Sequence, residues 1–236
     1  MIEHAVTFGQ KTIRFSLEQK SRKALRISVM PDLAVGVSAP HDFSIEKILR
    51  KVKRHASWIA KQIDYFKSFM PKEPPRQFIS GETHYYYGRQ YRLKVIRSKK
   101  QDVKLKGKYI YVYSLRPESR PRSKRLVYEW YRARSQKMFA VIVERCHDRL
   151  KKYGIRLPAI DVKVMKSRWG SCVYTKGRIG LNTELIKAPS HCIEYVIMHE
   201  MCHLKYPNHT KQFYSFLSLV IPDWEKRKAR LERVIL

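Results

Sequence analysis

Apolar and polar positions alternate in short runs through residues 4 to 39, which is the pattern of β-strands with one buried face. The runs AVTFG, KTIRFSL, ALRISVM and LAVGVSAP are separated by polar or turn residues, so we expect strands joined by hairpins. Pro40 closes this section. Ser44 is then a candidate N-cap for a helix whose apolar positions run from Ile45 to Ile63 at helical spacing.

A second alternating stretch begins at Gly81, and it predicts another sheet with turns at Gly88 and Gly107. A basic, proline-marked segment at 116 to 125 leads into a long helical pattern from about 122 to 153, which Gly154 ends. This segment is the candidate domain boundary. We expect a β-rich region with one helix at 1–115 and a second, mainly helical domain at 116–236.

The last third of the chain mixes short strands with helices. Residues 160–165 and 177–185 have strand patterns, and Pro189 and Ser190 precede a helix that Pro207 stops. A short helix beginning near His209, with Asn208 as its cap, and a charged C-terminal helix follow. No internal repeat is evident in the sequence. The expected fold class is α+β, a β-rich N-terminal half followed by a helical core with a small sheet.

Charge is the unusual feature of the composition. The 50 Lys and Arg residues against 20 Asp and Glu give a formal net charge of +30. Such a charge attracts polyanions, so nucleotides or nucleic acid are candidate partners. The basic residues are spread along the whole chain, however, and a solvated surface explains them equally well. Composition alone therefore identifies no particular polyanion.

The sequence indicates a soluble protein with reduced thiols. No stretch approaches the roughly 20 apolar residues that a membrane span requires, and the first residues lack the apolar segment of a secretory signal. The four cysteines show no C-x-x-C pairing. We therefore expect a cytoplasmic protein with no membrane partner.

The strongest chemical signal is HEMCH at 199–203. Two histidines four residues apart on a helix lie about 40° from each other around its axis, so both can bind one ion. Glu200 lies about 100° from His199, at the edge of the same face. Neutral imidazoles beside a free carboxylate are what a hydrolytic zinc site requires, so we expect one Zn²⁺, with Glu200 as the catalytic base for water.

A catalytic zinc site needs a third protein ligand, and His209 is the candidate. It follows Pro207, where the chain can turn back toward the ion. Glu194 or a carboxylate in the last helix is an alternative ligand, although Glu194 has a poor angle on the same helix. Cys202 is interpreted as a buried thiol.

Several segments carry a family resemblance: MKSRWGSC at 165–172, GRIGLN at 177–182, YVIMHEMCHL at 195–204 and NHTKQF at 208–213. Together with the order of elements upstream, they resemble the YgjP-like predicted metal-dependent hydrolases, relatives of SprT-like zinc peptidases. The resemblance implies a zincin-like metallopeptidase core in which His199, His203 and His209 bind the metal and Glu200 is the base. The metzincin pattern does not fit, because Tyr206 replaces its glycine.

Residues that bind substrate are harder to identify. Arg168 is a candidate for binding an anionic group or positioning the site, whereas its neighbours Trp169 and Cys172 are interpreted as packing residues. Asn182 is a candidate for bonding a substrate backbone, and a structural turn explains it equally well. Tyr206, Tyr214 and Arg168 are candidates for stabilising an oxyanion.

Three functions remain open. The first is peptide hydrolysis, with a peptide or protein substrate. The second is hydrolysis of a nucleotide phosphoanhydride at the same site, because Lys166, Arg168, Lys205 and Lys211 lie near it in sequence. The third is a DNA-associated protease, or a nucleic-acid-binding module whose metal is structural. In the third case, the bases of the nucleic acid would stack on tyrosines of the β-rich half, although the same tyrosines are equally explained as half-buried sheet residues: Tyr85, Tyr86, Tyr87, Tyr109, Tyr111 and Tyr113.

Overall fold

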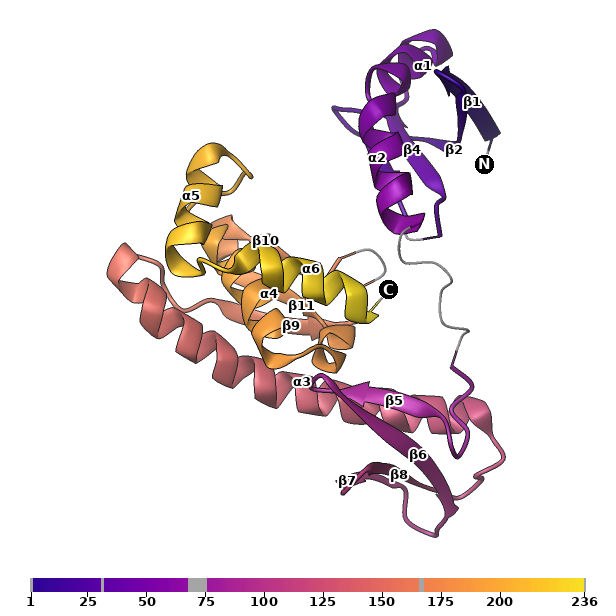
Figure 1. Cartoon of the computed structure of the whole chain (residues 1–236), viewed down its shortest axis with the longest axis vertical. Helices are drawn as coiled ribbons and strands as arrows, with labels where there is room; N and C mark the ends of the chain where they lie inside the picture. The colour runs from indigo at the N-terminus through magenta and orange to yellow at the C-terminus, as the bar shows by residue number, and fades with distance from the viewer. Residues whose placement is uncertain (1, 31, 68–75, 166–167, 236) are drawn as a thin grey trace. The chain divides into compact units, whose positions relative to one another are not determined.

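The structure is a computed structural model that describes residues 2–30, 32–67, 76–165 and 168–235. It is an α+β protein, as the sequence predicts. Its contacts divide the chain into two compact units, Met1–Glu73 and Pro74–Ile235. Figure 1 shows the elements of each unit.

The first unit is a four-stranded sheet, sheet A, with two helices packed on one face. Its elements are β1 (Ile2–Phe8), β2 (Lys11–Lys20), β3 (Arg26–Val29), β4 (Val35–Pro40), α1 (Ile45–Arg54) and α2 (Ala56–Lys67). The sequence predicts one helix here, but the chain breaks at His55, where α1 ends. The break lets Ile48 and Val52 of α1 and Ala56 and Ile59 of α2 all bury completely in one core.

The second unit holds two sheets and four α-helices among its described residues. Sheet B and the following helix consist of β5 (Thr83–Tyr86), β6 (Arg89–Arg97), β7 (Asp102–Lys106), β8 (Tyr109–Ser114) and α3 (Arg120–Leu150). The remaining elements are β9 (Ala159–Lys163), β10 (Gly170–Val173), β11 (Arg178–Asn182), α4 (Ser190–Cys202), α5 (Lys211–Val220) and α6 (Trp224–Ile235), with short 3-10 turns at Lys151–Tyr153, Tyr174–Lys176 and Thr183–Lys187.

The compact units do not divide where the sequence predicted a boundary, between 115 and 116. The long helix α3 contacts β7 and β8 on one side and β9 and α4 on the other, as Figure 1 also shows. Leu126 and Val127 of α3 therefore share one hydrophobic core with Val112 of sheet B and Leu181 of the small sheet. Sheet B belongs with the helical core because α3 joins the two.

Sheets A and B have the same topology, although the sequence showed no internal repeat. The strand order is β1-β2-β4-β3 in sheet A and β5-β6-β8-β7 in sheet B. In both, the two central strands are parallel and each edge strand is antiparallel to its neighbour. Different hydrophobic residues can form equivalent strands, so two sheets can share a topology without sharing a sequence pattern.

The small sheet, sheet C, has the order β10-β11-β9, with β10 at its edge. Strand β10 is antiparallel to β11 and contacts α4. Trp169 and Cys172 pack against the hydrophobic core, as their interpretation as packing residues predicted. The turn between β5 and β6 meets the chain just before α4, where the Tyr87 and Gly88 N–H groups donate to the carbonyls of Ile186 and Lys187. Among the described residues, no helix combines the length and apolar character that a bilayer crossing requires.

Candidate metal centre

Helix α4 and the segment after it bring three histidines together. His199 lies on the last turn of α4 and His203 is its C-cap, so one helical turn separates the two imidazoles. His209 lies between α4 and α5. One ring nitrogen of each histidine falls within 4.8 Å of the others, and the Nε2 atoms of His209 and His199 are 3.0 Å apart. The three imidazoles therefore converge on one point, as the sequence predicts.

Two contacts hold these rings in place. The Nδ1 atom of His203 is 3.1 Å from the carbonyl oxygen of Tyr206, which leaves its Nε2 for an ion. Phe213 of α5 packs against all three imidazoles, with ring centroids 5.0 Å from His199, 4.5 Å from His203 and 4.8 Å from His209. Helix α5 begins with Thr210 as its N-cap, and not with Asn208 as the sequence suggested, because the Thr210 side chain accepts from the Phe213 N–H.

The donor set fits a divalent transition metal. Burial lowers the pKa of His199 to about 3 and also lowers the pKa of His203 and of His209, so all three imidazoles are neutral at pH 7. Neutral imidazole is the form that binds metal. A trio of histidines without a carboxylate is a known arrangement for a zinc ion that keeps a fourth position open.

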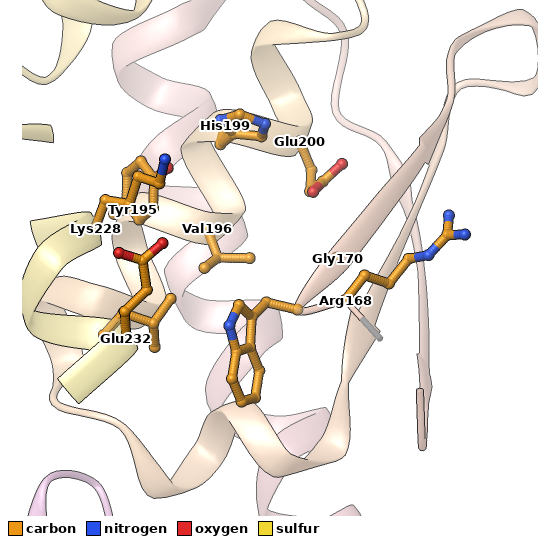
Figure 2. A pocket seen from close by; sticks show the side chains of 10 residues that line it. Arg168, Gly170, Tyr195, Val196, His199, Glu200, Lys228 and Glu232 are labelled. Carbon is orange, nitrogen blue, oxygen red and sulfur yellow. The ribbon is translucent and has the colours of Figure 1, made fainter. Parts of the chain in front are cut away.

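Glu200 is buried beside this trio, with 8% of its surface exposed. Burial raises the pKa of its carboxyl to about 7, and the positive charge of Arg168 opposes that shift. Figure 2 shows the carboxylate pointing toward the strand that carries Gly170. A Cβ on Gly170 would lie 2.6 Å from both Cγ and Oε1 of Glu200. The sequence analysis did not single out Gly170, although a glycine between Trp169 and Ser171 on an edge strand is a signal of close approach.

A pocket of about 180 Å³ opens beside His199 and Glu200 (Figure 2). Its lining comes from β10 and the residues before it, from α4 and from α6: Arg168, Trp169, Gly170, Tyr195, Val196, His199, Glu200, Lys228, Leu231 and Glu232. The sequence offered α6 only as the source of an alternative carboxylate ligand. In the structure α6 instead contributes Lys228, Leu231 and Glu232 to the pocket wall, and the metal-binding group found among the described residues consists of the three histidines. Trp169 lines this pocket and also packs against the core.

The predicted substrate residues have different surroundings. Asn182 is 3% exposed, and its amide is fully bonded: Oδ1 accepts from the N–H groups of Met165 and Glu184, and Nδ2 donates to the carbonyls of Met165 and Arg168. No donor or acceptor of this amide remains for a substrate. The structure thus favours the structural turn that the sequence left open, and the prediction that Asn182 bonds a substrate backbone is corrected.

The side chains of Arg168 and Tyr206 do not point at the three histidines. Arg168 lines the pocket, but its guanidinium points away from His199 in Figure 2. The ring of Tyr206 packs against Phe216, with centroids 5.4 Å apart. Its contact with the histidines is made by its backbone carbonyl oxygen, which is bonded to Nδ1 of His203. Tyr214 is the predicted oxyanion residue whose ring contacts the trio, because it stacks on His209 with ring centroids 5.9 Å apart.

The remaining candidates fall outside the site. Glu194 is bonded to the guanidinium groups of Arg149 and Arg227, at 2.7 and 2.6 Å, so its carboxylate is not a metal ligand here. Cys202 is fully buried, and burial raises its pKa to about 12. Lys205 donates to the carbonyl of Tyr153, away from the pocket, and Lys166 lies outside the described residues.

Comparison with known proteins adds the family. No curated protein matches the chain in sequence. The model of the YgjP-like metallopeptidase domain matches residues 23–234, a span that includes strands β3 and β4 of sheet A, all of sheet B and the whole three-histidine site. A metallopeptidase is a metal-dependent hydrolase. Because the match covers nearly all of a 236-residue sequence, the chain belongs to the YgjP-like metallopeptidase family.

Proposed function

We propose that this protein hydrolyses peptide bonds, using one zinc ion bound by His199, His203 and His209 and Glu200 as the base. The observation that carries the proposal is the convergence of three neutral imidazoles beside the buried carboxylate of Glu200, which does not belong to the group that could hold the metal. The family match supports the class of reaction. When bound, the zinc ion supplies Lewis-acid chemistry, polarising a carbonyl and making water more acidic.

Residues around the metal would each have a separate role in the reaction. Glu200 accepts a proton from the attacking water and delivers it to the leaving amine. A carboxyl whose pKa lies close to the working pH is suited to both transfers. Gly170 leaves room for this carboxylate, and Tyr214 is the proposed donor to the developing oxyanion because it lies against His209.

The pocket supports an extended substrate that passes between β10 and α6. The edge strand β10 has one side without a strand partner among the described residues, since sheet C ends there. A peptide backbone can pair with such an edge. Lys228 and Glu232 of α6 place one charge of each sign on the opposite wall. We propose a peptide or protein substrate for this reason.

A nucleotide phosphohydrolase at the same site is the second candidate. The observation that favours it is the presence of Lys228 in the pocket lining, because its ammonium group attracts phosphate. Against it, Glu232 lines the same pocket, and phosphoryl transfer more often uses Mg²⁺ held by carboxylates.

The deciding experiment compares the zinc-loaded protein with its Glu200→Gln variant on three substrates: casein, a panel of nucleoside triphosphates and a DNA-bound protein. The amide keeps the shape of the carboxylate but cannot accept the proton, so we expect the variant to keep one zinc per chain and to lose activity by about 100-fold or more. Consumption of casein by the wild type alone supports the peptidase. Consumption of nucleotides alone eliminates it, and equal inactivity of both proteins on everything rejects hydrolysis at this site.

A further inference from the structure

Sheet B carries a row of tyrosines on the face that is turned away from the hydrophobic core. Strand β8 alternates buried and half-exposed residues, and Ile110 and Val112 face α3 within the core. Tyr109, Tyr111 and Tyr113 therefore share the opposite face, which we call the tyrosine face. Their ring centroids are 5.9 and 6.3 Å apart along the strand, and the second pair is stacked at 16°.

Cations flank Tyr109 and Tyr111 on both sides, whereas Tyr113 lies between Ile96 and Asp102. On β6, Arg92 pairs with Tyr109 and Lys94 with Tyr111; on β7, Lys106 and Lys104 pair with the same two tyrosines. The Lys94 ammonium lies 3.9 Å from the centre of the Tyr109 ring and 5.7 Å from that of Tyr111. Asp102, opposite Tyr113, is the acidic residue in these pairs, and Lys104 lies 3.4 Å from its carboxylate. The tyrosine face is therefore strongly positive.

Sheet A shows that the topology does not require this row. Its strand β4 occupies the position of β8, between a parallel and an antiparallel neighbour, and its outward residues include Gly36 and Ser38. The outward partners of these two residues on β2 are Ser16 and Glu18. The β3 partners of the same two residues are Ser28 and Arg26. The same fold is thus built in this chain without aromatic residues at these positions, so strand formation alone does not explain three adjacent tyrosines.

We infer that the tyrosine face of sheet B binds single-stranded nucleic acid, as a site separate from the metal centre. Unpaired bases stack on aromatic rings, and the phosphates that connect them bind lysine and arginine. The half-exposed phenol rings supply the first contact, and Arg92, Lys94, Lys104 and Lys106 supply the second. Stacking needs free base faces, which a duplex hides, so the tyrosine face prefers single strands. The inference does not rest on the proposed peptidase activity.

The test measures binding of a fluorescein-labelled oligothymidylate and oligouridylate to the full chain by fluorescence anisotropy. The main variant is Tyr109→Thr/Tyr111→Thr/Tyr113→Thr, because threonine keeps a high strand preference and removes the rings. We expect its affinity for single strands to fall at least about tenfold, since each stacked base contributes substantially to binding. The triple Tyr→Phe variant keeps the rings, and we expect it to bind within about twofold of the wild type.

General attraction to the +30 chain needs its own control. The pair Lys124→Gln/Lys137→Gln removes two exposed cations from α3, and the pair Lys94→Gln/Lys104→Gln removes two from the tyrosine face. We expect the second pair to weaken single-strand binding more than the first. Duplex DNA and heparin serve as competitors, and we expect both to displace the oligonucleotide poorly compared with unlabelled single strands.

Three results would overturn the inference: a threonine variant that binds like the wild type, duplex or heparin that competes as well as single strands, or photocrosslinks to the oligonucleotide that map outside β6, β7 and β8. If circular dichroism shows that the triple threonine variant does not fold, Tyr111→Thr replaces it. Unchanged binding of that folded single variant, together with equal effects of the two lysine pairs, overturns the inference as well.

Discussion

At the scale of single residues, Gly170 has the clearest consequence for catalysis. A methyl group at this position would lie within 2.6 Å of the Glu200 side chain, so Gly170→Ala must displace the carboxylate. The three histidines lie elsewhere on α4 and after it, and their geometry does not depend on Gly170. We expect the variant to bind one zinc ion and to lose about 100-fold in kcat, because a small displacement of a catalytic group has a large effect.

Metal analysis and steady-state kinetics on the substrate of the wild type check this prediction. Ser171→Ala on the same strand is the matched control, and it should retain activity. Loss of zinc from Gly170→Ala would mean that the glycine supports the metal site as a whole and not Glu200 in particular.

A second residue, His84, should make stability depend on pH. Its side chain is 1% exposed, and burial lowers its pKa to about 4, although the hydrogen bond to Glu82 at 2.9 Å opposes this shift. In the unfolded chain the pKa returns to about 6.5. Between these two pH values the unfolded state binds a proton that the folded state does not. The contribution to the free energy of unfolding is therefore fully present above pH 6.5, and it falls by up to about 3 kcal/mol as the pH decreases to 4.

Urea unfolding at a series of pH values compares the wild type with His84→Gln, which cannot titrate. We expect the free energy of unfolding of the wild type to fall more steeply between pH 6.5 and 4 than that of the variant. His191→Gln, at an exposed position in the same unit, controls for removal of any histidine. Parallel curves for the wild type and His84→Gln would refute the assignment.

At the scale of elements, the N-terminus of α5 connects helix formation to the metal centre. Thr210 caps this helix through the N–H of Phe213, and Phe213 packs on all three imidazoles. Thr210→Ala removes the cap and should lower the free energy of unfolding by about 1 kcal/mol. The loosened first turn should also weaken zinc binding.

Denaturant unfolding and competition against a chromophoric zinc chelator measure the two effects, with Thr210→Ser as the control that keeps a hydroxyl acceptor. A Thr210→Ala variant with wild-type zinc affinity would show that the packing of Phe213 alone fixes the site.

At the scale of the whole molecule, the metal should contribute to stability. A ligand that binds the folded state and not the unfolded state stabilises folding, by about 4 kcal/mol when its free concentration is 1,000 times its Kd. The three proposed ligands belong to the second unit, so dialysis against a chelator should lower the Tm of that unit. Calorimetry with and without zinc measures the shift. Equal Tm values for the apo and zinc-loaded protein, or an undiminished shift in His209→Ala, would contradict the proposed ligand set.

Much of the architecture follows from local patterns. The alternating runs predicted strands in both sheets, and helical spacing predicted α3, α4, α5 and α6, because burial on one face imposes a period that the sequence records. The break at His55 escaped prediction, since both halves of the helical pattern are apolar on the same face. The predicted boundary at 115/116 relied on composition, whereas α3 buries residues against sheet B and against the helical core.

By itself the sequence predicted which residues come together at the candidate metal centre, because His199, His203 and Glu200 are neighbours on one helix and His209 follows a proline that ends the helical pattern. Only the tertiary structure decided what surrounds them. Gly170, Phe213 and the wall from α6 come from elements separated in sequence, and the full bonding of Asn182 depends on segments that meet in space. Local chemistry is fixed by spacing along the chain, whereas packing depends on which surfaces meet when the chain folds, and that information is not local.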